Sequence, residues 1–501
     1  MSVNYKVDLH EKGTPYPHYW EFCVGSCHAA TLLRADVQEH IRKAHRDIGF
    51  RYIRFHGLFD DDMSVYFSPL IGDQVTSFYN IDLIFDFLLD IGMKPFIELG
   101  FMPSCLASTG QTTFHYKGYT SMPNDEEAWK KLIRDLAEHL IERYGLAEVS
   151  EWFFEVWNEP NLHFFFDGTQ EDYFHLYEIT ARTLKEVDPC LKVGGPATSV
   201  NAWIPDFVNF CKCNDVPVDF VSTHHYPSDD PLSSAGMNGP GKKGGGMSKE
   251  DMKNMTPEEI KKIIAAFIQK KENKNPRDVL ARMTKKAKEE AGTLPLYYTE
   301  WNGSHDFDNN YQAAFIIQTL AYNHDLVEGY SYWTVSDIFE EMGMKPGPFK
   351  NEFGIQTNHG VPKPSYRLFE ALHAAGDIRL DVPSADPNVE VLALTNGDEA
   401  TVFVYNHDLE RRTVKDEEVE LTLAGAADVW KAVIDETHTA PVRCWEAMGS
   451  PAYLNKAQVL ALNEASVLKY EKVRGEETGA GQKFCFTAGP ESVTIFKCRI
   501  Q

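Results

Sequence analysis

The sequence predicts a closed barrel of eight β/α units followed by a smaller antiparallel β domain. Its 501 residues, 43% hydrophobic and 25% charged, have the composition of a globular chain with a large core. Short β-rich runs alternate with longer amphipathic stretches over most of the sequence. After Gly376 the pattern changes to period-two alternation, so a second domain of a different class is expected there.

Eight β-rich runs lie between residues 22 and 334, with stretches of helical periodicity between and after them. Eight such units favour a closed parallel barrel over an open doubly wound sheet. The expected strands are Phe22–Cys27, Tyr52–His56, Lys94–Gly100, Phe153–Asn158, Leu191–Gly194, Phe220–His224, Leu296–Glu300 and Gly329–Thr334. The expected helices are Asp36–Asp47, Ile81–Ile91, Asp125–Tyr144, Glu171–Val187, Ala202–Asn214, Thr256–Ala291, Asn310–Asp325 and Pro364–Ala375.

Two domains are expected, a catalytic barrel over residues 16–375 and an accessory β domain over residues 376–501. The alternating runs of the second part are separated by turn residues such as Asn396-Gly397. This pattern is typical of an antiparallel sheet with one buried face, similar to a β-sandwich.

The N-terminal residues are expected to join the β domain, not the barrel. Ser2–Leu9 alternates polar and apolar residues and precedes the first barrel strand, so residues 1–15 are expected to add a strand. Trp430 and Trp445 are expected to fill the core of this domain.

The charge of the chain argues against two classes of partner. Lys and Arg number 49 against 74 Asp and Glu, which gives a formal net charge of −25. Such a negative field repels phosphate backbones and anionic lipid headgroups. Neither nucleic acid nor a membrane surface is therefore expected as a partner.

Localisation is expected to be cytoplasmic. Met1–Pro17 contains no apolar stretch typical of a signal peptide, and apolar runs such as Ile81–Ile91 are interrupted by aspartates. The nine cysteines form no CxxC pair, and this usage is typical of a reducing compartment.

Two glutamates stand at the ends of predicted barrel strands, where barrel enzymes place their chemistry. Glu159 follows the fourth strand in an Asn-Glu-Pro sequence, and Glu300 ends the seventh strand before Trp301-Asn302. Glycosidic bond cleavage needs two such carboxyl groups, one protonated and one ionised. The alternative is that each glutamate forms a structural ion pair with a nearby Arg or Lys.

These motifs also resemble those of a known family. Phe154–Asn161, Tyr298–Asn302 and Tyr330–Glu341 resemble the glycoside hydrolases of clan A, and within them family 39, which contains retaining β-xylosidases and α-L-iduronidases. The resemblance runs from Cys23 through the β-rich tail. It implies a (β/α)8 barrel and hydrolysis of glycosides without a cofactor.

The resemblance implies roles for the two glutamates and their neighbours. Glu159 matches the general acid/base, Glu300 the nucleophile, and Asn158 the amide that holds the sugar 2-hydroxyl. The residues themselves support the same assignment, because Glu159 has Pro160 and an apolar run beside it, which favours a raised pKa. The hydroxyl groups next to Glu300 favour an ionised carboxylate there. A retaining pair is expected about 5–5.5 Å apart.

The resemblance also implies a set of substrate-binding residues at other strand ends. Arg54 matches an arginine near the nucleophile, with a barrel-floor ion pair to Glu155 or Glu98 as the alternative. His224 and Tyr226 match a pair that hydrogen-bonds the nucleophile, and whether His224 or His225 faces the site is left open. The remaining expected substrate-binding residues are His56, Trp333 as an aromatic floor, and Glu340.

No metal and no cofactor is expected. His224-His225 and Asp60–Asp62 contain metal-ligating residue types, but adjacent strand residues point to opposite faces and no third ligand has suitable spacing. The GxGxxG match at Gly239–Gly244 does not join a strand directly to a helix. The surrounding 228–255 segment is interpreted as either a lid over the barrel mouth or a flexible insertion.

The predicted function is a retaining exo-glycoside hydrolase, a β-xylosidase that releases xylose from the non-reducing end of xylo-oligosaccharides or cleaves aryl xylosides. An α-L-iduronidase or another β-glycosidase of the family is the alternative within the same class. A non-catalytic carbohydrate-binding barrel is the alternative outside it. Self-association into a homo-oligomer is left open.

Overall fold

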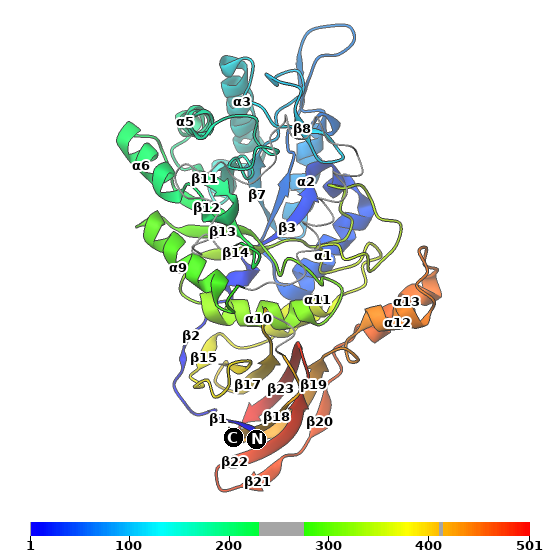
Figure 1. Ribbon diagram of the computed structural model, residues 1–501. Coiled ribbons are helices and arrows are strands. Elements are labelled where there is room, and N and C mark those ends of the chain that lie inside the picture. The colour runs from blue at the N-terminus through cyan, green and yellow to red at the C-terminus, as the bar shows by residue number, and fades with distance from the viewer. Residues whose placement is uncertain (1, 230–274, 410–413) are drawn as a thin grey trace, which may run out of the picture.

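A computed structural model describes residues 2–229, 275–409 and 414–501 (Figure 1). The Gly239–Gly244 motif, most of the 228–255 segment and the first part of the expected helix Thr256–Ala291 lie outside the described residues. The barrel and the β domain lie one above the other in this view, with both chain ends at the β domain.

The predicted fold class is confirmed. Eight parallel strands close into a barrel in the spatial order β3, β4, β7, β10, β11, β12, β13 and β14, and β14 pairs with β3 to complete the ring. The strands are β3 (Cys23–His28), β4 (Tyr52–His56), β7 (Lys94–Leu99), β10 (Phe153–Val156), β11 (Lys192–Thr198), β12 (Phe220–His225), β13 (Leu296–Trp301) and β14 (Gly329–Tyr332). Each corresponds to one of the eight predicted runs.

Helices surround the barrel and bury apolar faces against the strands, and α10 is buried on nearly every side because it also packs on the β domain. They are α1 (Ala35–Ile48), α2 (Tyr79–Asp90), α3 (Glu126–Tyr144), α5 (Gln170–Val187), α6 (Ile204–Asn214), α9 (Val279–Ala291), α10 (Tyr311–Asn323) and α11 (Pro364–His373). The helix ends carry recognisable signals. Thr169 and Asp172 form a capping box at the start of α5, and Gly49 ends α1 in the left-handed region.

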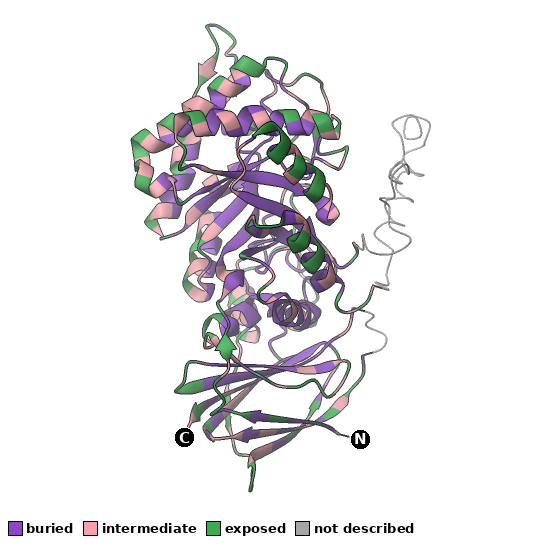
Figure 2. Ribbon diagram, turned by 90° about the vertical axis from the view of Figure 1, so that its left-hand side faces the viewer, coloured by how far each residue is buried: buried purple, intermediate pink, exposed green. Residues whose placement is uncertain are grey.

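Aromatic rings fill the N-terminal end of the barrel. Phe22, Phe96, Phe153 and Phe220 pack together there, with the rings of Phe96 and Phe153 stacked 5.1 Å apart. This apolar layer leaves the opposite, C-terminal end of the strands as the place where polar side chains gather. Figure 2 shows the barrel strands as an almost wholly buried layer.

The β domain consists of two sheets that enclose a second core. One sheet has the order β2 (Thr14–Pro15), β15 (Ile378–Leu380), β16 (Val389–Thr395), β17 (Glu399–Asn406), β23 (Ser492–Ile500), β19 (Ala426–Ile434) and β20 (Glu471–Val473). The other has the order β1 (Val3–Asp8), β18 (Glu417–Ala424), β22 (Gly481–Ala488) and β21 (Glu476–Thr478).

The N-terminal strand is part of this domain. β1 runs parallel to β18, with Val3 opposite Val419, and buries every second residue. Val3, Tyr5 and Val7 point into the core between the two sheets. The period-two pattern of the sequence thus corresponds to one buried and one exposed face.

Two helices, not predicted from the sequence, form a hairpin that interrupts the β domain. It comprises α12 (Pro441–Ala447) and α13 (Lys456–Ala465). Asn455 and Gln458 form a capping box at the start of α13, a signal present in the sequence. Trp445 lies on α12 and packs on Phe349 of the loop after β14, so its expected place in the β core is wrong.

The barrel and the β domain are in contact through α10, which packs on β17 and β23. At this junction Asn310 donates a hydrogen bond of 2.6 Å from its amide to the Glu491 carbonyl, and the Glu491 carboxylate pairs with His407. Within the described ranges no helix has the length and apolar character needed to cross a bilayer.

A buried ion pair holds the segment between β14 and α11. Lys363 is fully buried, and its ammonium lies 2.7 Å from Asp308 and 2.8 Å from Asp337.

We expect Lys363→Met to lower the free energy of unfolding by about 3–5 kcal/mol, because two carboxylates lose their buried cation. Urea denaturation measures this. The control Lys286→Met removes an exposed pair with Glu290, and it should cost less than about 1 kcal/mol. Equal stabilities of the two variants would contradict this prediction.

Candidate active site

The predicted site residues come together at the C-terminal ends of the barrel strands. Arg54 and His56 lie at the end of β4, and Asn158 and Glu159 directly follow β10. The other strand ends contribute His224 (β12), Glu300 (β13) and Trp333 (after β14), while Tyr226 follows β12. These residues are buried or nearly so, and Glu159 and Glu300 are 7% and 6% exposed.

Arg54 is the electrostatic centre of this group. Its guanidinium donates to Glu155 at 2.6 Å, to Glu300 at 2.8 Å and to the Asn158 amide oxygen at 2.9 Å. It also lies 2.9 Å from Glu98. Burial alone would lower the pKa of Arg54, but the three carboxylates raise it, so the guanidinium stays charged. Arg54 thus forms the barrel-floor ion pairs with Glu98 and Glu155 and also contacts Glu300, so both of the expected arrangements occur together.

Glu300 receives two strong hydrogen bonds. Arg54 donates to one carboxylate oxygen, and the Tyr226 hydroxyl donates to the other at 2.7 Å. A charged guanidinium and a phenol thus replace the water that burial removes. The second oxygen lies 3.7 Å from the His224 ring, beyond hydrogen-bond distance.

Glu159 is in a different environment. Burial raises its pKa to about 7, and the Ser199 hydrogen bond and the charge of Arg54 only partly oppose this. The backbone turns sharply at Glu159, since Trp157 and Glu159 have φ values of 72° and 42°. Non-glycine residues adopt such values rarely and often at functional sites.

His224 lies between the two halves of the site. The resemblance implies that it bonds the nucleophile, but the structure directs its Nδ1 to Glu159 at 3.0 Å. Its Nε2 lies 3.1 Å from the Thr299 hydroxyl, and Thr299 donates its own proton to Glu155 at 2.8 Å. Thr299 therefore accepts from His224 Nε2–H.

The proton positions follow from this chain. Burial lowers the pKa of His224 to about 4, so the ring is neutral near pH 7. A neutral ring that donates through Nε2 has an acceptor at Nδ1. The bond between Nδ1 and Glu159 then requires that Glu159 be the donor. Geometry and pKa agree that Glu159 holds a proton near neutral pH.

The open question of which histidine faces the site has a structural answer. His225 points away from the site, where its Nε2 pairs with the Tyr330 hydroxyl at 3.0 Å and its ring stacks on Tyr298. The two histidines occupy opposite faces of β12, as adjacent strand residues do.

The floor and one wall of the site are aromatic. The ring of Trp333 lies 4.8 Å from that of His56 and is 3% exposed. Gly25 lies against the Trp333 ring, and only glycine fits there because a Cβ would be 2.3 Å from the indole. Phe114 stacks on His56 at 5.9 Å. The His56 Nδ1 pairs with Glu98 at 2.7 Å, and its Nε2 lies 3.6 Å from Glu300.

Glu341 reaches the site, and the sequence analysis named its neighbour Glu340 instead. A Glu341 carboxylate oxygen lies 3.7 Å from His56 Nε2, and burial together with the charges of Glu300 and Glu159 raises its pKa well above the usual range. Glu340 lies 3.5 Å from Arg34 and is 27% exposed. Glu98 and Thr299 were also missed as site residues, although both sit near the ends of predicted strands, a position that could have revealed them.

One set of site residues has the composition of a metal site. Glu159, His224 and Glu300 offer ligand atoms that all lie within 4.8 Å of one another. Their hydrogen bonds already account for these atoms, since Glu159 faces His224 and Glu300 is bound by Arg54 and Tyr226. The arrangement suits one protonated and one ionised carboxyl group. That is the division of roles which glycoside hydrolysis requires.

Comparison with known sequences identifies the family. The sequence model described as "Glycosyl hydrolases family 39" matches residues 3–271 and 263–481. The chain belongs to glycosyl hydrolase family 39. It is therefore an enzyme of the O-glycosyl hydrolase class, as its motifs predicted.

Relatives within family 39 are similar over nearly the whole chain. A protein named beta-xylosidase from Caldicellulosiruptor saccharolyticus is 46% identical over 469 residues, which are 91% of this chain and 90% of that protein. A beta-xylosidase from Geobacillus stearothermophilus is 36% identical and covers 89% of this chain and 86% of its own. The crystal structure of a monomeric beta-xylosidase from Caulobacter crescentus CB15 has a TM-score of 0.80, 30% identity and full coverage of both chains.

The raised pKa of Glu159 predicts how hydrolysis depends on pH. A carboxyl group with a pKa of about 7 donates its proton below that pH and loses it above, so kcat/KM should fall about tenfold per pH unit above pH 7. The measurement is kcat/KM against pH for a nitrophenyl glycoside that the enzyme hydrolyses.

Two variants test whether Glu159 causes this fall of kcat/KM above pH 7, called the alkaline limb. Glu159→Gln has no proton to lose, so its residual activity should not show the limb. Glu98→Gln is the matched control, because burial also raises the pKa of Glu98 to about 7, and this variant should keep the limb. A limb that persists in Glu159→Gln would contradict the assignment of the acid.

Proposed function

We propose that the protein is a retaining β-xylosidase that removes xylose from the non-reducing end of short xylo-oligosaccharides. The observation that carries the proposal is the pair of carboxyl groups in unlike environments. A carboxylate oxygen of Glu159 lies within 4.8 Å of one of Glu300. This upper limit on the distance between two oxygens supports the roughly 5–5.5 Å spacing of a retaining pair over the roughly 6.5–9.5 Å of an inverting one.

In the first step Glu300 attacks the anomeric carbon and Glu159 protonates the departing oxygen. Arg54 and Tyr226 hold the Glu300 carboxylate by its two oxygens and fix its orientation for attack. Glu159 shares its proton with His224 before substrate binds and transfers it to the leaving group as the bond breaks. The result is a glycosyl-enzyme on Glu300.

In the second step Glu159 acts as a base. Ionised after the first step, it takes a proton from a water molecule that attacks the glycosyl-enzyme and releases the sugar with its original configuration. Asn158 supports both steps. Its amide oxygen accepts from Arg54, so the amide N–H groups point the other way and are available to the sugar 2-hydroxyl.

The choice of xylose rests on the crowded wall of the site and on the relatives. Phe114 packs on His56 and on Phe165, whose ring lies 5.1 Å away, and Phe339 packs on Trp333. We expect these rings to fill the place where a hexose carries its C5 hydroxymethyl group, which xylose lacks. The two sequence relatives carry the name beta-xylosidase.

Two other readings have less support. A uronate substrate needs a cation for its carboxylate, and the guanidinium of Arg54 is already engaged by Glu98, Glu155 and Glu300. The similarity to the mouse α-L-iduronidase covers only 30% of this chain. A binding protein without activity would not need two carboxyl groups with divided protonation.

Two further properties belong to this proposal. We place the enzyme in a reducing, cytoplasmic compartment, since all nine cysteines are free thiols. Short oligosaccharides or aryl glycosides are its proposed substrates. The expected roles of His56 and Glu340 in binding them stay predictions, as does association into a homo-oligomer.

The roles of Glu159 and Glu300 are distinguished by the activity of their variants on an aryl substrate with a good leaving group. Glu300→Ala should reduce turnover below detection, because no covalent intermediate forms. Glu159→Ala should still form the intermediate, and added azide should restore turnover with a β-glycosyl azide as product. Proton NMR of the azide product shows whether the β configuration of the substrate is retained. The control Glu138→Ala, at an exposed residue of the outer helix α3, should retain turnover of the aryl substrate and form no azide adduct. An α-glycosyl azide, or rescue of Glu300→Ala in place of Glu159→Ala, would contradict the roles.

The substrate proposal is tested with a panel of nitrophenyl glycosides. We expect kcat/KM for the β-xyloside to exceed that for the β-glucoside roughly 10–200-fold, which corresponds to a steric cost of about 1–3 kcal/mol. Phe114→Ala should narrow this ratio, whereas Phe164→Ala, at a ring that is 55% exposed, should leave it unchanged. Equal rates on both glycosides, or a preference for an iduronide, would refute the xylosidase proposal and leave the retaining mechanism in place.

A further inference from the structure

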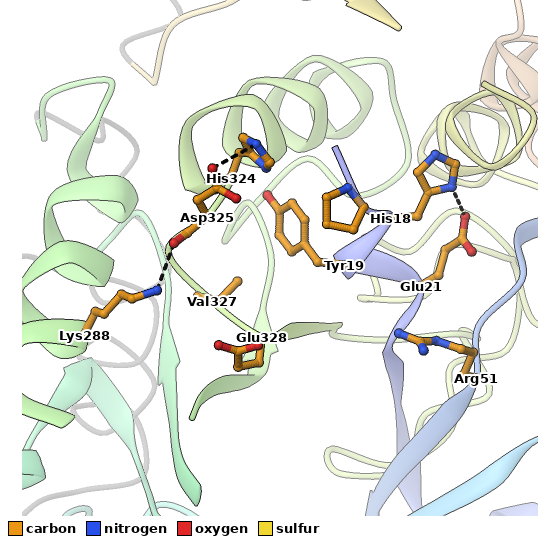
Figure 3. A pocket seen from close by; sticks show the side chains of 10 residues that line it. His18, Tyr19, Glu21, Arg51, Lys288, His324, Asp325, Val327 and Glu328 are labelled. Carbon is orange, nitrogen blue, oxygen red and sulfur yellow. Dashed lines mark hydrogen bonds and ion pairs between the residues drawn. The ribbon is translucent and has the colours of Figure 1, made fainter. Parts of the chain in front are cut away.

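Two histidines and a glutamate meet at the end of the barrel opposite the catalytic residues. His18 and Glu21 lie at the short helix η1 (Tyr19–Glu21), which leads into β3, and both line a cavity of about 590 Å³ (Figure 3). Arg51 and Glu328, which precede β4 and β14, line the same cavity. The cluster therefore lies at the N-terminal ends of the strands, and it takes no part in glycoside hydrolysis.

The third member of the cluster comes from the last turn of α11. His373 Nδ1 lies 2.9 Å from the Glu21 carboxylate oxygen that is also 2.7 Å from His18 Nδ1. All three possible ligand atoms lie within 4.8 Å of one another. Ligand atoms at about 2.0–2.2 Å around a tetrahedral zinc ion are roughly 3.4 Å apart, so small side-chain rotations are sufficient to admit the ion.

The outer contacts of His18 are those of a metal ligand. Its Nε2 lies 3.3 Å from the Gly376 carbonyl, which accepts the Nε2 proton and leaves Nδ1 turned toward Glu21. Metal-bound histidines commonly donate their other ring N–H to such a carbonyl. The ring also stacks on the buried Trp20 at 4.6 Å, which fixes its plane.

The backbone at Gly49 makes room for the cluster. This residue has a φ of 82°, and a Cβ there would lie 2.5 Å from the His373 ring and 3.0 Å from Glu21. A side chain at this position would displace both groups. The end of α1 thus forms one wall of the cluster, and solvent forms another, because the His373 side chain is 39% exposed.

We propose that His18, Glu21 and His373 bind a zinc ion or a similar divalent transition metal, with water as the fourth ligand. Two imidazole nitrogens favour zinc, nickel or copper over magnesium and calcium, which prefer oxygen ligands. The sequence predicted no metal, because His373 is far from His18 along the chain and only the fold brings them together.

The bound ion stabilises the fold. It connects the segment before β3 to the end of α11, and through His18 to Gly376, where the chain leaves the barrel for the β domain. Metal binding to the folded state alone raises the melting temperature. Zinc should therefore raise Tm and leave kcat/KM unchanged at temperatures where the apoenzyme is folded.

The test uses the full-length, untagged protein after treatment with a chelator. Titration with Co²⁺ should give one equivalent of bound metal with visible d–d absorption and no thiolate-to-cobalt charge transfer, since the ligands are nitrogen and oxygen. Addition of Zn²⁺ should displace the Co²⁺ and raise Tm. The absence of a thiolate-to-cobalt charge-transfer band distinguishes this cluster from sites at exposed cysteines.

Matched variants locate the site. His373→Ala and His373→Gln should each weaken Co²⁺ binding at least tenfold and abolish the zinc-dependent rise in Tm. His175→Ala is the control, because His175 forms an exposed 2.8 Å pair with Glu126 on the outer helices and should bind as the parent does. Absence of the d–d spectrum in the parent, or equal Co²⁺ affinity of the parent and both His373 variants, would overturn the proposal.

Discussion

The buried guanidinium of Arg54 is the interaction on which the catalytic end of the barrel depends. Three strands, β7, β10 and β13, bring carboxyl or amide groups to it, and without its charge Glu98, Glu155 and Glu300 would be buried close together as anions. A buried carboxylate is tolerated only when it is paired and hydrogen-bonded. The strand ends of the barrel are therefore held together by charge where the opposite end is held by aromatic packing.

The same guanidinium explains why two glutamates of one site behave differently. Glu300 lies in direct contact with Arg54, whereas Glu159 contacts a neutral histidine. Thr299 and Glu155 fix the tautomer of that histidine, and Glu155 is itself held by Arg54. One cation thus contacts Glu300 directly and reaches Glu159 through three side chains, Glu155, Thr299 and His224, as the proposed roles of the two glutamates require.

Much of this could be predicted from the sequence, because parallel barrel strands are local apolar runs and Glu159 and Glu300 stand at their ends. Features that depend on contacts between distant parts of the chain, or on irregular segments, were not predicted. Glu341 was not named beside Glu340, since the loop after β14 has no periodicity that fixes which neighbour points inward. The bond of His224 to Glu159 depends on the turn at Trp157, and the helices α12 and α13 lie within an otherwise alternating tail.

The aromatic layer at the base of the barrel has a consequence for the order of events during turnover. Phe22, Phe96, Phe153 and Phe220 fill the N-terminal end of the barrel, so a substrate reaches the site from the C-terminal side of the strands. In the proposed mechanism, the leaving group departs and the water enters on this same side of the barrel. In the proposed retaining mechanism, an aglycone that stays on this side excludes the water that would release the sugar, so it extends the life of the glycosyl-enzyme. It thereby gives an alcohol in the same position the chance to accept the sugar in place of water.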